Sequence, residues 1–146
     1  MREIREVIFR GKRLHDNKWI YGNFISDCEG NPHIIEPRFF CEDGHHLQYE
    51  DNTDTPVFII PETVGQYTGL TDKNGTKIFE GDIVTGWFNH EKIVGYIFYG
   101  GNAQFFIQRD GIYGIGLDNS DCWLEVIGNI HDNPELLGGE NNGINR

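Results

Sequence analysis

Short apolar stretches rich in Ile, Val, Phe and Tyr recur along the chain, and glycine, asparagine or proline residues interrupt them. Runs of β-branched and aromatic residues bounded by turn residues are typical of β-strands. No long segment repeats its apolar residues at the spacing of an amphipathic helix. We therefore expect single helical turns at residues 61–65 and 133–137, and strands at residues 6–10, 18–25, 33–36, 57–60, 77–79, 83–88, 92–99, 104–109, 112–117 and 123–130.

The spacing of these strands divides the chain into two halves of a mainly β protein. In residues 71–137, short strands follow one another through tight turns, a pattern typical of a small barrel whose closure removes exposed strand edges. Residues 72–75, Asp-Lys-Asn-Gly, predict one such turn, because Asn and Gly tolerate positive φ. Residues 1–70 predict a β-rich N-terminal subdomain with an acidic insert at 39–55. This subdomain has too few strands for a core of its own, so we expect it to lean on the barrel. Residues 138–146 predict a flexible tail.

Composition indicates a globular protein of a reducing compartment. The chain has 146 residues, and its net charge is −11 because 23 acidic residues outnumber 12 lysines and arginines. This charge opposes passive binding to a phosphate backbone, which needs clustered cations.

The three cysteines are too few and odd in number for a disulfide framework. No apolar run approaches the roughly 18 residues of a membrane span, and the charged N-terminus lacks the apolar region of a secretory signal. We expect a cytoplasmic protein.

One group of side chains has the chemistry of a zinc site. Cys28, His33, Cys41, His45 and His46 carry the thiol and imidazole groups that tetrahedral zinc prefers. None of their spacings is the closely spaced cysteine pair of a zinc knuckle. A loop with incidental histidines and cysteines is the favoured explanation, so we assign no metal ligand, and a zinc-binding protein stays a further alternative.

The residues do not predict catalysis or a cofactor. Ser26 and Ser120 are the only serines, and neither lies in a nucleophile elbow. Cys122 has no neighbouring cation that would lower the pKa of its thiol. The paired carboxylates lie in polar loops, where water keeps both groups ionised. We expect a protein that is not an enzyme and binds no cofactor.

Seven segments of the chain together carry a family resemblance: residues 5–12, 19–22, 60–70, 72–75, 78–84, 125–130 and 133–137. The central segment, residues 60–70, is too long to be a chance motif. Together the segments resemble the YopX family of bacteriophage and prophage proteins. The resemblance implies a protein of the bacterial host cytoplasm whose second half is similar to an SH3-like barrel, and it implies no catalytic residues.

Aromatic side chains on the expected barrel are the candidate binding residues. Adjacent residues of a strand point to opposite faces, so one member of each aromatic pair is buried and the other is available to a partner. The candidate residues are Trp87, Phe88, Tyr96, Tyr99 and Phe106. We expect them to bind a host or phage protein. A homo-oligomer interface, or contact with the N-terminal half, explains the same residues.

A nucleic-acid-linked role is the alternative. A single-strand binder would present a basic groove around Arg10, Lys12, Arg13 and Lys18. A decoy for DNA-binding enzymes would instead use the acidic surface to resemble the charge of DNA.

Overall fold

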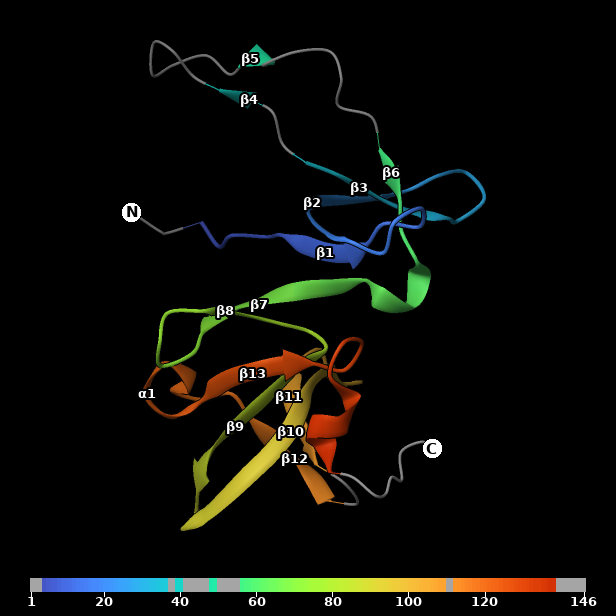
Figure 1. Ribbon diagram of the computed structural model, residues 1–146. Helices are drawn as coiled ribbons and strands as arrows, with labels where there is room; N and C mark the ends of the chain where they lie inside the picture. Colours follow the sequence, from blue (N-terminus) through green and yellow to red (C-terminus); the bar gives the residue numbers. More distant parts are fainter. Residues whose placement is uncertain (1–3, 37–38, 41–47, 50–55, 110–111, 139–146) are drawn as a thin grey trace. The chain divides into compact units, whose positions relative to one another are not determined.

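The computed structural model describes residues 4–36, 39–40, 48–49, 56–109 and 112–138 (Figure 1). The chain is mainly β, as the sequence predicts, and forms two compact units. Residues 6–66 form the N-terminal unit; the residues from Tyr67 onward, with Arg5, form the C-terminal unit. The elements are β1 (Phe9–Lys12), β2 (Trp19–Ser26), β3 (Pro32–Ile35), β4 (Phe39–Phe40), β5 (Gln48–Tyr49), β6 (Val57–Phe58), η1 (Pro61–Thr63), β7 (Gly65–Thr71), β8 (Lys77–Phe79), β9 (Asp82–Phe88), β10 (Glu91–Tyr99), β11 (Phe105–Arg109), β12 (Ile112–Gly116), α1 (Ser120–Trp123), β13 (Glu125–Asn129) and η2 (Pro134–Leu137).

The N-terminal unit is an antiparallel sheet with a small core of its own. Its strands lie in the order β6-β3-β2-β1, and β1 also pairs with the first residues of β7. Ile20, Ile34 and Ile59 are buried at its centre. The expected acidic insert, residues 39–55, contains the paired strands β4 and β5, and its other residues lie outside the described part of the chain.

Gly22 on β2 allows the close approach of β3. A Cβ added to Gly22 would lie against the carbonyl oxygen of Ile35, with the carbonyl carbon 2.8 Å away. We predict that Gly22→Ala lowers the free energy of unfolding by about 1–3 kcal/mol, because backbone must shift to make room. Urea denaturation measures this loss. Gly101→Ala is the matched control, since nothing lies within 4 Å of its added Cβ. Equal unfolding free energies for the two variants would contradict the prediction.

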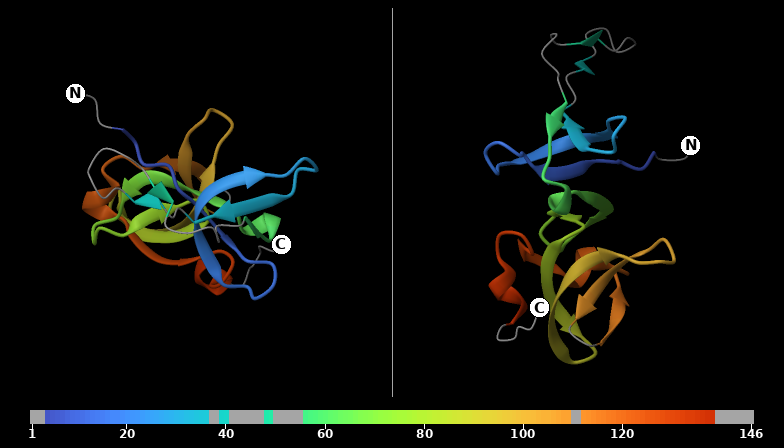
Figure 2. Two further views of the ribbon diagram at one scale, coloured as in Figure 1. Left: turned by 90° about the horizontal axis from the view of Figure 1, so that it is seen from above. Right: turned by 90° about the vertical axis from the view of Figure 1, so that its right-hand side faces the viewer.

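The C-terminal unit contains a five-stranded antiparallel sheet in the order β12-β11-β10-β9-β13 (Figures 1 and 2). The expectation of a closed barrel is wrong: among the described residues, β12 and β13 each pair with only one strand and do not pair with each other. Apolar side chains from β9, β10, β11 and β12 form the core on one side of the sheet, together with Ile78, Leu117 and Leu124, and the partly buried Val126 of β13 packs against it. The buried residues from the sheet are Val84, Ile93, Ile97, Ile107 and Ile115.

The turn at Asp72 explains why the sheet stays open at β13. The Asp72 side chain is 2% exposed, and its Oδ2 accepts a hydrogen bond of 2.9 Å from the Val126 N–H. Its Oδ1 accepts 2.9 Å bonds from the N–H groups of Asn74 and Thr76. The Lys73 N–H donates to the Leu124 carbonyl oxygen. This turn therefore takes the hydrogen bonds that a closing strand would need, and the tight turn predicted here is confirmed.

The environment of Asp72 favours its charged form. Burial acts to raise the pKa of Asp72, but the three backbone N–H donors and the Lys73 charge outweigh burial. The pKa of Asp72 therefore lies below its ordinary value of 3.8.

Several elements differ from those expected. The first strand covers Phe9–Lys12 rather than residues 6–10, and the helix α1 was not predicted. Strand β7 was not predicted; Gly69, with a φ of +91°, lies within it where the β7–β8 register shifts between Tyr67 and Thr71. The last strand begins at Glu125 rather than Trp123, because α1 ends with the Leu124 N–H donating to the Ser120 carbonyl oxygen. In the described residues, no helix has the length and apolar character needed to cross a bilayer.

Candidate functional site

A two-residue turn sets the register of the aromatic side chains in the C-terminal unit. Asn89 and His90 both have positive φ, 52° and 68°, which is the geometry of a tight hairpin turn. The turn joins β9 to β10 and places Trp87 opposite Lys92. Further along, Phe98 of β10 lies opposite Phe106 of β11.

This register brings three of the five candidate residues to one face of the sheet. Because alternate residues of a strand share a face, Trp87 and Phe106 lie on the same side as Tyr96. Ile93, Ile97 and Ile107 face the core on the other side, so this side is the outer one. Ile83, opposite Tyr96, is nevertheless buried on this side, and the face is most exposed toward Trp87. Val94 and Phe98 share it. We call these residues the outer aromatic face: Trp87, Val94, Tyr96, Phe98 and Phe106.

The outer aromatic face is accessible and ordered. Trp87 is 67% exposed and Val94 is 38% exposed, while the remaining three residues are half-buried. The rings of Phe98 and Phe106 are stacked with centroids 5.5 Å apart, and the centroids of Tyr96 and Phe98 are 6.4 Å apart. Rings already held by their neighbours lose little side-chain entropy when a partner binds.

Glycines make room for the Phe106 ring. A Cβ on Gly100 would lie 2.6 Å from Phe106 Cε2, and a Cβ on Gly114 would lie 3.1 Å from Phe106 Cβ. The sequence shows glycine at both positions but does not show which ring needs the space.

Phe88 and Tyr99 lie on the core side of the sheet, at opposite ends of the β9–β10 hairpin. The Phe88 ring contacts Trp123, with centroids 5.6 Å apart. Tyr99 is 53% exposed and meets Phe105 edge to face at 5.1 Å. The structure thus does not bring these two residues together with the other three.

A cavity of about 420 Å³, which we call the Arg109 pocket, opens beside Phe88. Its walls are Phe88 and Trp123, Arg109 and Asp118, and β12 from Gly114 to Gly116. Arg109 Nη1 lies 3.5 Å from Glu91 Oε2, at the limit of a hydrogen bond. Arg109 Nε is buried and donates to no residue that the structure describes. Sequence reasoning missed this pocket.

A second cavity of about 320 Å³ adjoins the first, and the two share Gly116 and Asp118. Its other walls come from β7, β11 and the segment after β12. They are Thr68, Leu70, Gln104, Phe105, Phe106, Leu117 and Asn119.

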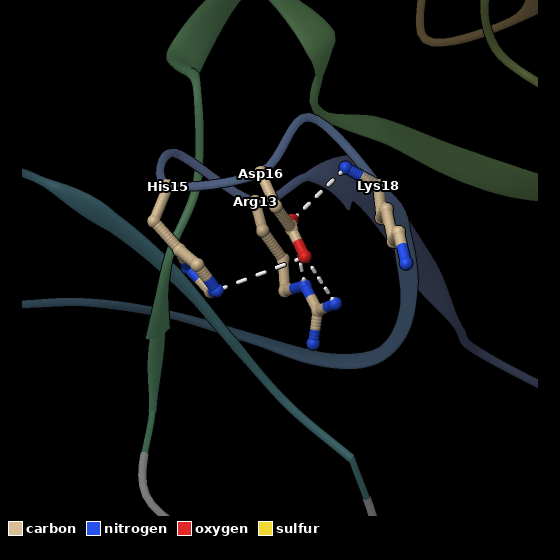
Figure 3. A network of polar contacts seen from close by, with 4 residues as sticks. All are labelled: Arg13, His15, Asp16 and Lys18. Atoms are coloured by element: carbon tan, nitrogen blue, oxygen red, sulfur yellow. Dashed lines mark hydrogen bonds and ion pairs between the residues drawn. The ribbon is translucent and has the colours of Figure 1, made fainter.

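Three of the four residues of the expected basic groove, Arg10, Lys12 and Arg13, make side-chain contacts within the N-terminal unit. Arg13 Nε and Nη2 donate to the Asp16 carboxylate at 3.0 and 2.6 Å, and the Lys18 N–H donates to Asp16 Oδ1 (Figure 3). The hydrogen bond from Arg13 is the main reason that the pKa of Asp16 lies below its ordinary value. Arg10 and Lys12 lie 4.7 and 5.4 Å from the centroid of the Trp19 ring. These contacts do not favour the basic groove of a single-strand binder.

Only two of the five possible zinc ligands lie in the described residues. Cys28 is exposed. His33 is buried, with Nδ1 3.0 Å from the Asn31 carbonyl oxygen and its ring 4.3 Å from the Phe58 ring. Cys41, His45 and His46 lie outside the described part of the chain, and among the residues inside it no three His, Cys, Asp or Glu side chains converge as metal ligands.

These features define a mainly β protein with two compact units, an open five-stranded sheet and an aromatic outer face. The chain belongs to the YopX protein family, whose model matches residues 8–138. It is similar to the crystal structure of protein EF1440 from Enterococcus faecalis, with 25% sequence identity and a TM-score of 0.57. That similarity covers 91% of this chain and 99% of the other. No curated protein matches the sequence.

Proposed function

We propose that this protein is a non-enzymatic interaction module, which binds a basic host or phage protein in the bacterial cytoplasm through the outer aromatic face. The single observation that carries the proposal is the 67% exposure of Trp87, which lies on the same face of the sheet as the Phe98–Phe106 ring stack. Tryptophan and tyrosine contribute the largest share of the energy in many protein interfaces. An open SH3-like arrangement of the five strands is part of the proposal.

Charge supports a basic partner. Residues 67–138 contain four lysines and arginines against ten aspartates and glutamates, which is a formal charge of −6. An acidic surface attracts a cationic partner and speeds its association. It opposes the phosphate backbone of a nucleic acid.

The ionisable groups support a role without catalysis. The pKa values of the Asp16, Asp27 and Asp72 carboxyl groups are all lowered. A general acid at neutral pH needs the opposite shift.

Affinity capture from host lysate, compared between variants, tests the proposal. We expect the wild-type chain and Leu14→Ser to retain the same protein, and Trp87→Ser to lose it. Leu14→Ser is the matched control because it removes an apolar side chain that is 60% exposed on the N-terminal unit. Retention of that protein by Trp87→Ser, or retention of nothing by the wild type, would overturn the proposal. Capture of only a second copy of this chain would show that the outer aromatic face forms a homo-oligomer interface and does not bind a basic partner.

A further inference from the structure

The two edges of the five-stranded sheet differ in how they are covered. At the β13 edge, Asp72 and Lys73 hydrogen-bond to Val126 and Leu124. At the β12 edge, the backbone groups of Gly114 to Gly116 that point away from β11 have no hydrogen-bond partner among the described residues. An open strand edge is a template for an additional strand.

Glycine gives another strand access to this edge. Gly114 and Gly116 are exposed, and no atom lies closer than 3.8 Å to a Cβ built on Gly116. The absence of side chains at both positions lets a second backbone approach closely.

Both cavities lie along the same edge. The Arg109 pocket includes Gly114 to Gly116, and the second cavity includes Gly116 and Leu117. Domains that bind peptides by strand addition use backbone hydrogen bonds for affinity and side-chain pockets beside the edge for selectivity. The β12 edge has both features.

We propose that the β12 edge binds an extended segment of another protein as an added strand, and that the Arg109 pocket takes an acidic side chain of that segment. This inference goes beyond the proposed function, because it concerns a different surface of the same unit. The buried Arg109 Nε lacks an acceptor in the described chain, and the opposite charge of a carboxylate matches the guanidinium.

Among the described residues, Glu91 is the acidic side chain that contacts Arg109, and Asp118, which is exposed, lies in the wall of the same pocket. The Glu91 side chain is 66% exposed, and its 3.5 Å contact is long for a charge-assisted hydrogen bond. Glu91 can therefore turn into solvent when the segment binds. A second copy of β12 is a poorer occupant, because Ile112–Gly116 contains no Asp or Glu.

Nuclear magnetic resonance titration of the ¹⁵N-labelled full chain tests the inference. The probe is an acetylated and amidated peptide, Thr-Val-Glu-Val-Thr, and its matched control has Gln in place of Glu. We expect the Glu peptide to shift the amide signals of Gly114 and Gly116 and to bind roughly tenfold more tightly than the Gln peptide. Equal affinities, no binding at millimolar peptide, or shifts confined to the outer aromatic face would overturn the inference.

Two variants show whether Arg109 and Glu91 act as described. Arg109→Gln is expected to bind both peptides equally, whereas Lys92→Gln, which removes an exposed cation from the neighbouring strand β10, keeps the preference for Glu. Glu91→Gln is expected to bind the Glu peptide about threefold more tightly, since the competing carboxylate is gone. Weaker binding by Glu91→Gln would contradict the competition. These outcomes do not depend on Trp87. If the peptide experiments fail, the proposed function is unaffected and is judged by the capture experiment with Trp87→Ser.

Discussion

Replacing Asp72 by alanine is expected to lower the free energy of unfolding by about 3–5 kcal/mol, because three backbone N–H groups lose a buried, charged acceptor. The loss combines an effect within the turn, at Asn74 and Thr76, with a long-range effect at Val126. Denaturation by urea, followed by the fluorescence of the tryptophans, measures it. Asp132→Ala is a control, since Asp132 lies near the surface of the same unit. A loss below about 1 kcal/mol for Asp72→Ala would show that the turn does not hold the β13 edge.

The charge of Asp72 also makes stability depend on pH in a defined window. Its pKa is lower in the folded chain than the ordinary 3.8, so its contribution is complete above about pH 4 and is lost as the pH falls through the folded pKa. Asp72→Asn keeps one acceptor oxygen and removes the charge. We expect the wild-type chain to lose more stability than Asp72→Asn between about pH 4 and pH 2. Parallel stability curves over that range would contradict the sign of the shift.

Trp87→Ser is expected to weaken binding of the captured partner by about thirtyfold or more, which corresponds to roughly 2 kcal/mol. The Trp87 side chain is 67% exposed in the free protein, so the variant should keep its stability within about 0.5 kcal/mol. Isothermal calorimetry gives the affinity, and denaturation gives the stability. A change of less than threefold in affinity would remove Trp87 from the interface.

The salt dependence of the association rate distinguishes the contribution of the unit's charge from that of its aromatic contacts. Raising the salt concentration from 50 to 300 mM should slow association with a basic partner, for the wild type and for Trp87→Ser alike. An association rate that does not change with salt would contradict the choice of a basic partner.

Local patterns predicted most strands because each one is a short apolar run closed by turn residues. They failed at β7, where Gly65 and Gly69 interrupt the run and the strand is specified by its pairing with β1 and β8. They also failed at barrel closure. The Asp72 turn was predicted, but its hydrogen bond to Val126, 54 positions along the chain, has no local signal.

The candidate site was predicted in composition but not in arrangement. Because side chains alternate along a strand, Trp87 and Phe88 lie on opposite faces of the sheet. Once the turn at Asn89 is placed, the pairing of β9 with β10 shows which face each of them occupies. The Arg109 pocket depends on contacts between strands far apart in the sequence, from Phe88 to Trp123. No spacing of residues reveals such a cavity.

Three tryptophans report on three different surfaces. Trp19 lies between the basic side chains of the N-terminal unit, Trp87 lies on the outer aromatic face, and Trp123 lines the Arg109 pocket. Each indole N–H gives one signal in a ¹⁵N-labelled chain, and Trp87→Phe assigns that of Trp87. On addition of the captured partner, we predict a shift of the Trp87 signal while the Trp19 signal stays in place. A shift of Trp19 with Trp87 unchanged would contradict binding through the outer aromatic face.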